Sequence, residues 1–232
     1  HGRAPAFATG LKLANPDLSV WLVTGDGDAL SIGGNHFIHL LRRNVDMNVM
    51  LFNNEIYGLT KGQYSPTSEK GKVTKSSPMG SVDYPFNPIS LALGARSTFV
   101  ARTVDRFPKH IRETLHHAEK HNGTSFVEIF QNCLIFNDGA FEDISSKNGR
   151  KEDVIYLQNG EPLLFGSEVP KGLMLEGLTL KIVEIGDTYT EADCLVHDTS
   201  NHTLASLLAQ LGPEFPTPVG VFYQSQVETY ND

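Results

Sequence analysis

This sequence of 232 residues contains only two cysteines, Cys133 and Cys194. Two are too few for a disulfide framework and fit a reducing compartment, so we expect a cytoplasmic protein. No apolar run approaches the roughly 18 residues that span a bilayer, and no segment resembles a signal peptide.

Basic residues are also scarce. The sequence has 19 lysines and arginines against 27 aspartates and glutamates, which gives a formal net charge of −8. Because nucleic-acid phosphates require a basic surface, this composition argues against a nucleic-acid partner.

The first unit that the pattern predicts is a strand, a helix and a second strand. Residues 18–24 form a short, nearly continuous apolar run, which is typical of a central parallel strand buried on both faces. Apolar residues then recur at helical spacing from Phe37 to Leu41, and residues 47–52 predict a second buried strand. The helix between the two strands carries the chain back along the sheet by about 16 Å, and the second strand then runs forward over a similar distance, parallel to the first. The pattern is that of a β-α-β unit.

A polar motif follows each of the two strands. Gly25-Asp26-Gly27 comes after the first, and Asn53-Asn54 comes after the second. Because ligands bind at the carboxyl ends of strands in open α/β sheets, we expect Asp26 and Asn54 to lie side by side and to hold a hard cation such as Mg²⁺. Gly25 and Gly27 would let phosphate groups approach the backbone closely. Spacing alone leaves open an ordinary Rossmann-like turn with a capping aspartate.

The rest of the chain continues to alternate, and a polar stretch at residues 137–151 suggests a boundary. We expect an α/β fold with a mostly parallel sheet and helices on both faces, divided into a domain at 1–145 and a small C-terminal extension at 146–232. The histidines of the helix expected at 106–121 are interpreted as solvated or capping residues. The predicted helices are 88–95, 106–121 and 199–211, and the predicted strands or apolar runs are 98–101, 125–131, 154–157, 163–165, 178–185 and 219–223.

A longer resemblance surrounds these motifs. The segments GDGDALSIGGNHFIHLLRRN and LFNNEIYGLTKGQYSPTS, with SSPMGSVDYPFNP and FVEIFQNCLIFNDGAFED further on, closely resemble the thiamine-diphosphate-binding (PP-type) domain in the β subunit of 2-oxoacid:ferredoxin oxidoreductases. The resemblance is strong over residues 1–145 and looser beyond. It implies that Asp26, the Asn54 side chain and the Ile56 carbonyl hold Mg²⁺. It also implies that several residues lie at the diphosphate or near it, namely His1, Gly25, Gly27, Asp28, Gly58 and Leu59.

The resemblance also gives Cys133 a role. Considered alone, a cysteine at the end of a buried strand is more often a small packed residue than a ligand. In β subunits of this type, the matching position supplies one thiolate to a [4Fe-4S] cluster. Such a cluster needs more thiolates than the two cysteines of this chain supply. We therefore expect the chain to be an N-terminally incomplete segment of a longer subunit, unable to hold the cluster unaided.

The function that the resemblance implies is oxidative decarboxylation of a 2-oxoacid to acyl-CoA, with electrons passed to ferredoxin. The expected substrate is 2-oxoglutarate, with pyruvate second, and the expected cofactors are thiamine diphosphate, Mg²⁺ and a [4Fe-4S] cluster in the complete subunit. An α subunit is implied as partner, and Lys61, on a loop leaving the metal-binding turn, could contact substrate or coenzyme A. A non-oxidative thiamine-dependent decarboxylase or ligase and a catalytically silent nucleotide-binding module remain the alternatives.

Overall fold

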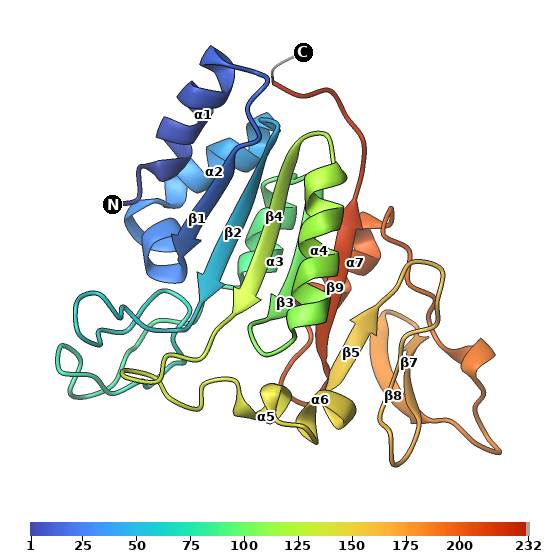
Figure 1. Cartoon of the computed structure of the whole chain (residues 1–232). Helices are drawn as coiled ribbons and strands as arrows, with labels where there is room; N and C mark the ends of the chain where they lie inside the picture. The colour runs from blue at the N-terminus through green and yellow to red at the C-terminus, as the bar shows by residue number, and fades with distance from the viewer. Residues whose placement is uncertain (231–232) are drawn as a thin grey trace.

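The computed structural model describes residues 1–230, and most of its helices cover a six-stranded sheet (Figure 1). The sheet order is β1-β2-β4-β3-β9-β5, and a separate three-stranded antiparallel sheet has the order β6-β7-β8. The strands are β1 (Trp21–Gly25), β2 (Met47–Asn53), β3 (Phe99–Val104), β4 (Thr124–Phe130), β5 (Val154–Leu157), β6 (Leu164–Phe165), β7 (Lys171–Glu176), β8 (Thr179–Glu184) and β9 (Thr217–Gln224).

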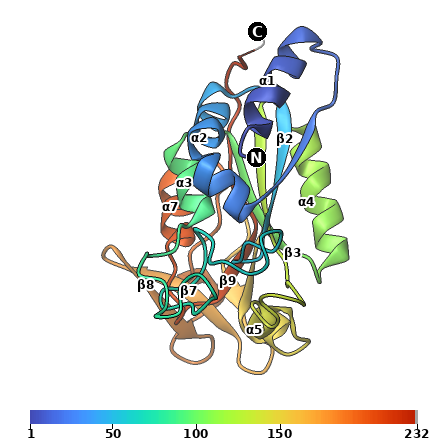
Figure 2. The same cartoon turned by 90° about the vertical axis from the view of Figure 1, so that its left-hand side faces the viewer.

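The helices lie on both faces of the larger sheet. Figure 2 shows α2, α3 and α7 on one face and α4 on the other. The α-helices are α1 (Ala4–Ala14), α2 (Gly34–Arg43), α3 (Pro88–Gly94), α4 (Pro108–Lys120), α5 (Glu142–Ser145), α6 (Gly149–Glu152) and α7 (His202–Ala209); a π-helical turn η1 spans Asp28–Ile32 and a 3-10 turn η2 spans Glu191–Asp193. The predicted α/β fold is confirmed, as is its mostly parallel sheet with helices on both faces.

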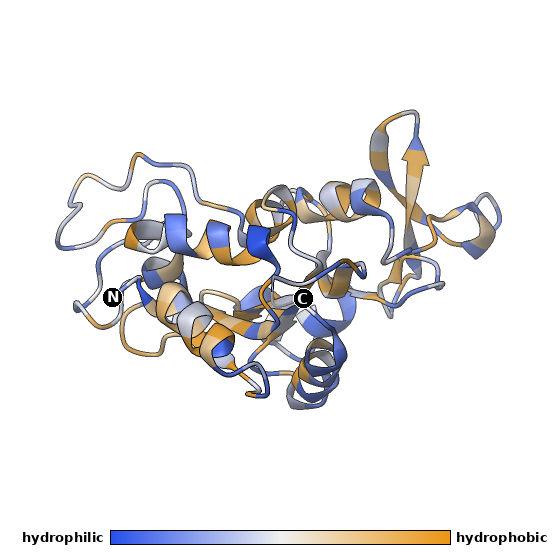
Figure 3. Ribbon diagram, turned by 90° about the horizontal axis from the view of Figure 1, so that it is seen from above, coloured by the Kyte–Doolittle hydropathy of each residue, from blue (hydrophilic) through white to orange (hydrophobic). Residues whose placement is uncertain are grey.

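The parallel half of the sheet follows from its sequence. β1, β2, β4 and β3 are parallel neighbours, and all six residues of β3 are buried. Side chains alternate between two cores: Phe126 of β4 packs in the core that includes Phe37 of α2, whereas Val127 packs with Ala118 of α4. Figure 3 shows hydrophobic and hydrophilic residues alternating along the helices, as expected for elements with one face on a core.

The segment after residue 145 takes part in the same sheet. β9 pairs with β3 in the antiparallel sense, and β5 pairs with β9 in parallel. The smaller sheet β6-β7-β8 lies beyond β5 (Figure 1). The division of the chain at residue 145 stays a prediction, but the strands on its two sides are hydrogen-bonded to each other.

One histidine of the α4 region, His110, differs from the prediction that these residues are solvated or capping, whereas His121 takes the C-cap position of α4, as that prediction allows. His121 is buried and its Nε2 lies 2.8 Å from the Thr98 hydroxyl, while His110 Nδ1 lies 2.8 Å from the Thr103 hydroxyl. Burial lowers the pKa of both, to about 4 for His110. The prediction failed for His110 because the helix is amphipathic and this position faces the sheet, where Thr103 of β3 contacts it. Within residues 1–230, no helix is long and apolar enough to cross a membrane.

Candidate functional site

The candidate site lies where β1 and β2 end. Gly25 at the end of β1 is aligned with Phe52 of β2, so the residues that follow each strand emerge at the same edge of the sheet. Asp26, which follows β1, is 2 % exposed, and Asn53, the last residue of β2, is 3 % exposed. The structure thus brings the two predicted motifs together, with their polar side chains in a buried environment.

Thr67 joins these two side chains. Its hydroxyl Oγ1 lies 2.7 Å from Asp26 Oδ2 and 2.9 Å from Asn53 Oδ1. Burial raises the pKa of Asp26 above its ordinary value, while hydrogen bonds from Ser65 and Thr67 act in the opposite direction. A buried carboxylate without a cation nearby is unfavourable, because burial disfavours the charged form. A bound cation would relieve that cost.

Asn54 provides the clearest test of whether a metal fits. Its side-chain oxygen Oδ1 is buried and has no hydrogen-bond partner among residues 1–230. Buried polar atoms are almost always paired, so an unpaired carboxamide oxygen at this edge calls for a ligand. Amide and carboxylate oxygens are the donors that Mg²⁺ prefers. The Asn54 oxygen, the Asp26 carboxylate and a backbone carbonyl such as that of Ile56 make a donor set that fits this ion.

The backbone of this turn is held in an uncommon conformation. Glu55, between Asn54 and Ile56, has φ of 55°, in the left-handed region that non-glycine residues seldom adopt. Its carbonyl accepts a hydrogen bond from Ser68 Oγ, and the backbone carbonyl of Asn54 accepts one from Asn137 Nδ2 at 2.9 Å. These contacts hold the backbone that follows the Asn54 Cα, in the turn from which its side chain projects.

Gly27 is packed against an aromatic ring. A Cβ added at Gly27 would lie 2.4 Å from Cε1 of Tyr57, whose hydroxyl donates a 2.7 Å hydrogen bond to the Gly27 carbonyl. By contrast, the nearest atom to a Cβ at Gly25 would be the Phe52 carbonyl oxygen, at 3.9 Å. The close approach of the Tyr57 ring therefore requires glycine at position 27, whereas position 25 has room for a methyl group.

We predict that Gly27→Ala destabilises the protein by about 1–3 kcal/mol, the usual cost of overpacking, because the new methyl group must displace the Tyr57 ring. Gly25→Ala is the matched control and should be nearly neutral in stability. Urea unfolding of the two variants, followed by circular dichroism, measures the difference. Equal unfolding midpoints for both variants would contradict this account of Gly27.

Asp28 lies in η1 and binds the start of the chain. Its Oδ1 accepts a 2.7 Å hydrogen bond from the Gly2 amide and lies 3.0 Å from His1 Nδ1, while Oδ2 accepts from the Thr24 hydroxyl at 2.9 Å. The structure thus places His1 next to Asp28. A diphosphate contact for either residue stays a prediction.

The remaining predicted residues lie on loops around this edge. Leu59 is 92 % exposed, and Lys61 is exposed with φ of 70°. A Cβ at Gly58 would lie 4.0 Å from Cys133 Sγ, so these two residues are neighbours. Cys133 is a half-buried free thiol. Across residues 1–230 there is no group of three or more His, Cys, Asp or Glu side chains that could hold a metal, so Cys133 has no set of protein ligands around it that would complete an iron–sulfur cluster.

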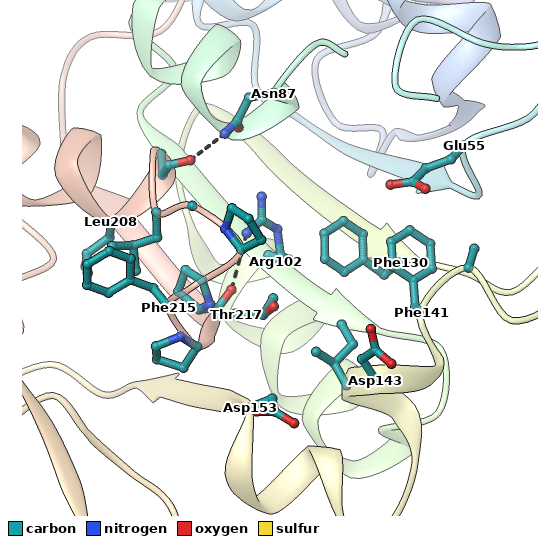
Figure 4. Close-up of a pocket in the computed structure, with 18 of the residues that line it drawn as sticks. Glu55, Asn87, Arg102, Phe130, Phe141, Asp143, Asp153, Leu208, Phe215 and Thr217 are labelled. Atoms are coloured by element: carbon teal, nitrogen blue, oxygen red, sulfur yellow. Dashed lines mark hydrogen bonds between the residues drawn. The ribbon is translucent and has the colours of Figure 1, made fainter. Parts of the chain in front are cut away.

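A cavity of about 560 Å³ opens next to the site. Figure 4 shows Arg102 and Phe130 in its wall, with Glu55 beyond Phe130. Burial, together with the nearby carboxylates of Glu69, Glu128 and Asp26, raises the pKa of Glu55 to about 8. Its buried position thus favours the protonated, uncharged form of this carboxyl group.

The sequence patterns missed three residues that hydrogen bonds connect to Asp26: Thr67 directly, and Glu128 and Arg102 through Asn53. Thr67 belongs to a serine- and threonine-rich loop that looks solvated in sequence, yet Ser65, Thr67 and Ser68 are all buried. Glu128 and Arg102 could have been found, because each interrupts an otherwise apolar or weakly polar buried strand with a charge. Charged residues are almost never fully buried without a partner, so a pair was to be expected.

Comparisons with known proteins show which family the chain resembles. Residues 1–129 match the family described as thiamine pyrophosphate enzyme, C-terminal TPP binding domain. The chain is 52% identical over 236 residues to the 2-oxoglutarate oxidoreductase subunit KorB of Mycobacterium tuberculosis, covering 100% of this chain and 63% of that protein. It is 49% identical over 169 residues to the 2-oxoglutarate synthase subunit KorB of Archaeoglobus fulgidus, covering 72% of this chain and 63% of that protein.

A solved structure is similar over the whole chain. The 2-oxoglutarate:ferredoxin oxidoreductase from Magnetococcus marinus, with 2-oxoglutarate, coenzyme A and succinyl-CoA bound, matches with a TM-score of 0.75 and 34% identity. The match covers 100% of this chain and 65% of that chain. The chain therefore spans a little less than two thirds of the length of these relatives.

Proposed function

Because this chain belongs to the thiamine pyrophosphate enzyme family and carries its C-terminal TPP-binding domain, we propose that it binds thiamine diphosphate through Mg²⁺ at the edge formed by β1 and β2. Asp26, the Asn54 side-chain oxygen and the Ile56 carbonyl would hold the metal. The observation that carries this proposal is the buried, unpaired Asn54 oxygen at the end of the strand beside Asp26. Gly25, Gly27, Asp28 and Gly58, with Leu59 and His1 at the rim, would surround the diphosphate.

We further propose that the complete protein is the β subunit of a 2-oxoacid:ferredoxin oxidoreductase, which acts together with an α subunit. Its proposed substrate is 2-oxoglutarate, and pyruvate is the second candidate. When bound, the cofactor supplies the carbanion chemistry that removes CO₂ from a 2-oxoacid. This chain's own residues bind and orient the diphosphate through the metal, and Lys61 could meet the substrate or coenzyme A from its exposed loop. The names of the similar proteins in Mycobacterium tuberculosis and Magnetococcus marinus favour 2-oxoglutarate.

Electron transfer to ferredoxin through a [4Fe-4S] cluster is the part of this proposal that depends on more than this chain. Cys133 would supply one thiolate, and its position beside Gly58 would bring the cluster close to the diphosphate turn. Residues 1–230 do not by themselves form a cluster site. The remaining thiolates would have to come from the part of the relatives' length that this chain does not span.

The test uses the full-length subunit assembled with its α partner. Calorimetry should show binding of thiamine diphosphate that requires Mg²⁺, and 2-oxoglutarate with coenzyme A should give CO₂ together with reduction of ferredoxin or methyl viologen. Release of CO₂ without reduction of either acceptor would show a non-oxidative thiamine enzyme instead. Absence of magnesium-dependent cofactor binding would show a catalytically silent module.

A further inference from the structure

A continuous line of buried polar side chains runs from the candidate metal site across the sheet. It begins at Asp26 and Thr67, passes through Asn53 of β2 and Glu128 of β4, and reaches Arg102 of β3. Each of these side chains is less than 9 % exposed. Polar groups are costly to bury, so a chain of them inside a sheet is expected to have a purpose that apolar residues could not fulfil.

The links are short and well defined. Asn53 Nδ2 donates to Glu128 Oε1 at 2.8 Å, and Arg102 Nε donates to Glu128 Oε2 at 2.7 Å. Arg102 and Glu128 are also aligned neighbours in the β3–β4 register, so the backbone itself holds the pair together. Their charges compensate each other inside the sheet, where an unpaired charge would be strongly unfavourable.

The direction of the hydrogen bonds follows from this ion pair. The Glu128 carboxylate can only accept, so Asn53 must present its amide NH₂ group to it and its oxygen to Thr67. That oxygen also accepts a 3.3 Å hydrogen bond from the Glu55 amide, in the turn that carries Asn54. The ion pair therefore fixes the Asn53 carboxamide, which in turn fixes the positions of Thr67 and of the turn.

The far end of the line rests on the C-terminal part of the chain. Arg102 Nη1 lies 3.5 Å from the Pro218 carbonyl of β9, a contact drawn as a dashed line in Figure 4. The Arg102 guanidinium also lies 4.8 Å from the Phe130 ring centre and 5.3 Å from that of Phe222 in β9. Strand β9 thus helps to hold the guanidinium in place.

We propose that Thr67, Asn53, Glu128 and Arg102 form a positioning network that holds the Asp26 carboxylate in the orientation for metal binding, with β9 as its outer support. This inference rests on the proposed function, since it assumes that Asp26 binds the cofactor metal. The network residues are positioning residues and make no contact with the metal themselves. Partners of metal ligands typically alter metal affinity by about 10- to 100-fold when they are removed.

The experiment measures affinity for Mn²⁺, which prefers similar oxygen ligands to Mg²⁺. The full-length subunit in its α-partner complex is titrated with Mn²⁺ in the presence of thiamine diphosphate, and free Mn²⁺ is followed by electron paramagnetic resonance. Thr67→Val, which keeps the shape but removes the hydroxyl, should weaken Mn²⁺ binding about 10-fold or more. Thr67→Ser, which restores the hydroxyl, should bind close to wild type.

Two further variants separate this effect from general damage. Thr103→Val removes another buried threonine hydroxyl, the one next to His110 Nδ1, and should leave Mn²⁺ affinity unchanged. Arg102→Lys keeps the charge but cannot reproduce the contacts to both Glu128 and Pro218, so it should weaken Mn²⁺ binding several-fold from a remote position. It also serves as the test if Thr67→Val does not fold.

The outcomes distinguish this inference from the proposed function. Wild-type Mn²⁺ affinity in both Thr67→Val and Arg102→Lys would overturn the positioning network and leave the cofactor site standing. A wild-type complex that bound no Mn²⁺ with thiamine diphosphate would overturn both. Equal weakening by Thr103→Val would also reject the network, because it would show that any lost buried hydroxyl has the same effect.

Discussion

Replacing Asp26 by alanine should abolish magnesium-dependent binding of thiamine diphosphate in the assembled complex. The variant removes the carboxylate of the proposed donor set, so we expect the affinity to fall by more than about 100-fold, beyond the loss typical for residues that only support a metal ligand. Titration of the wild-type and variant complexes with thiamine diphosphate in the presence and absence of Mg²⁺ measures this loss. Unchanged cofactor affinity would reject the site.

The same variant should retain its fold. Asp26 is buried and its pKa is raised, chiefly by burial. A carboxyl group whose pKa is higher in the folded state stabilises the fold at low pH, and this contribution is lost as the pH rises through the folded pKa. Removal of the Asp26 carboxyl group should therefore lower the stability of the fold only slightly at pH 7. The Thr67 hydroxyl can still donate a hydrogen bond to the Asn53 side-chain oxygen. We expect the melting temperature of the metal-free variant to equal or exceed that of the wild type.

Asp105→Ala provides the matched control for this experiment. Asp105 follows β3 as Asp26 follows β1, and its carboxylate accepts a 3.2 Å hydrogen bond from the Asn132 amide. It is therefore a carboxylate at the same edge of the sheet but outside the proposed donor set. Cofactor affinity should survive this change. If both variants lost the cofactor equally, the effect would reflect damage to the edge of the sheet and not removal of a metal ligand.

Replacing Arg102 by methionine should have the largest effect on stability. It leaves the Glu128 carboxylate, which is fully buried, without its cation. Breaking a buried ion pair on one side typically costs about 3–5 kcal/mol. Urea unfolding at neutral pH should show this loss as a lower midpoint. The exposed pair of Lys109 and Glu113 gives the control, because Lys109→Met should change stability by no more than about 0.5 kcal/mol.

A double variant tests the cause of that loss. Arg102→Met combined with Glu128→Gln removes the uncompensated charge and keeps an acceptor for the Asn53 amide group. Stability should recover in part, since removing both charges of a buried pair is much less costly than removing one. A double variant less stable than Arg102→Met alone would show that the arginine acts through packing against Phe130 and Phe222 and not through its charge.

Much of the fold could be predicted from the sequence, because the signals there are local. Apolar runs with turns at both ends predicted β1, β2 and β4, and helical periodicity predicted α2 and α4. The order of short strands around Gly25-Asp26-Gly27 and Asn53-Asn54 placed both motifs at one edge. The resemblance to 2-oxoacid:ferredoxin oxidoreductase β subunits, which rests on long segments, is likewise confirmed.

Which residues the supporting side chains contact could not be predicted, because their partners are remote in sequence. Thr67 meets Asp26 only after a loop of irregular backbone has folded over the edge, and no periodic pattern describes such a loop. The pairing of Arg102 with Glu128 depends on the strand order β2-β4-β3, which no run of residues specifies. The position of β9, antiparallel beside β3, could not be predicted for the same reason, because it too depends on the order of strands that are remote in sequence.

The place of β9 in the sheet also affects how the chain can fold during synthesis. β3 is flanked by β4, which follows it closely, and by β9, which leaves the ribosome only after residues 217–224 have been made. Until then, the outer edge of β3 offers unpaired backbone groups, and such edges invite pairing with other chains. A nascent chain that has completed only β1 to β4 is therefore the species most in need of a chaperone.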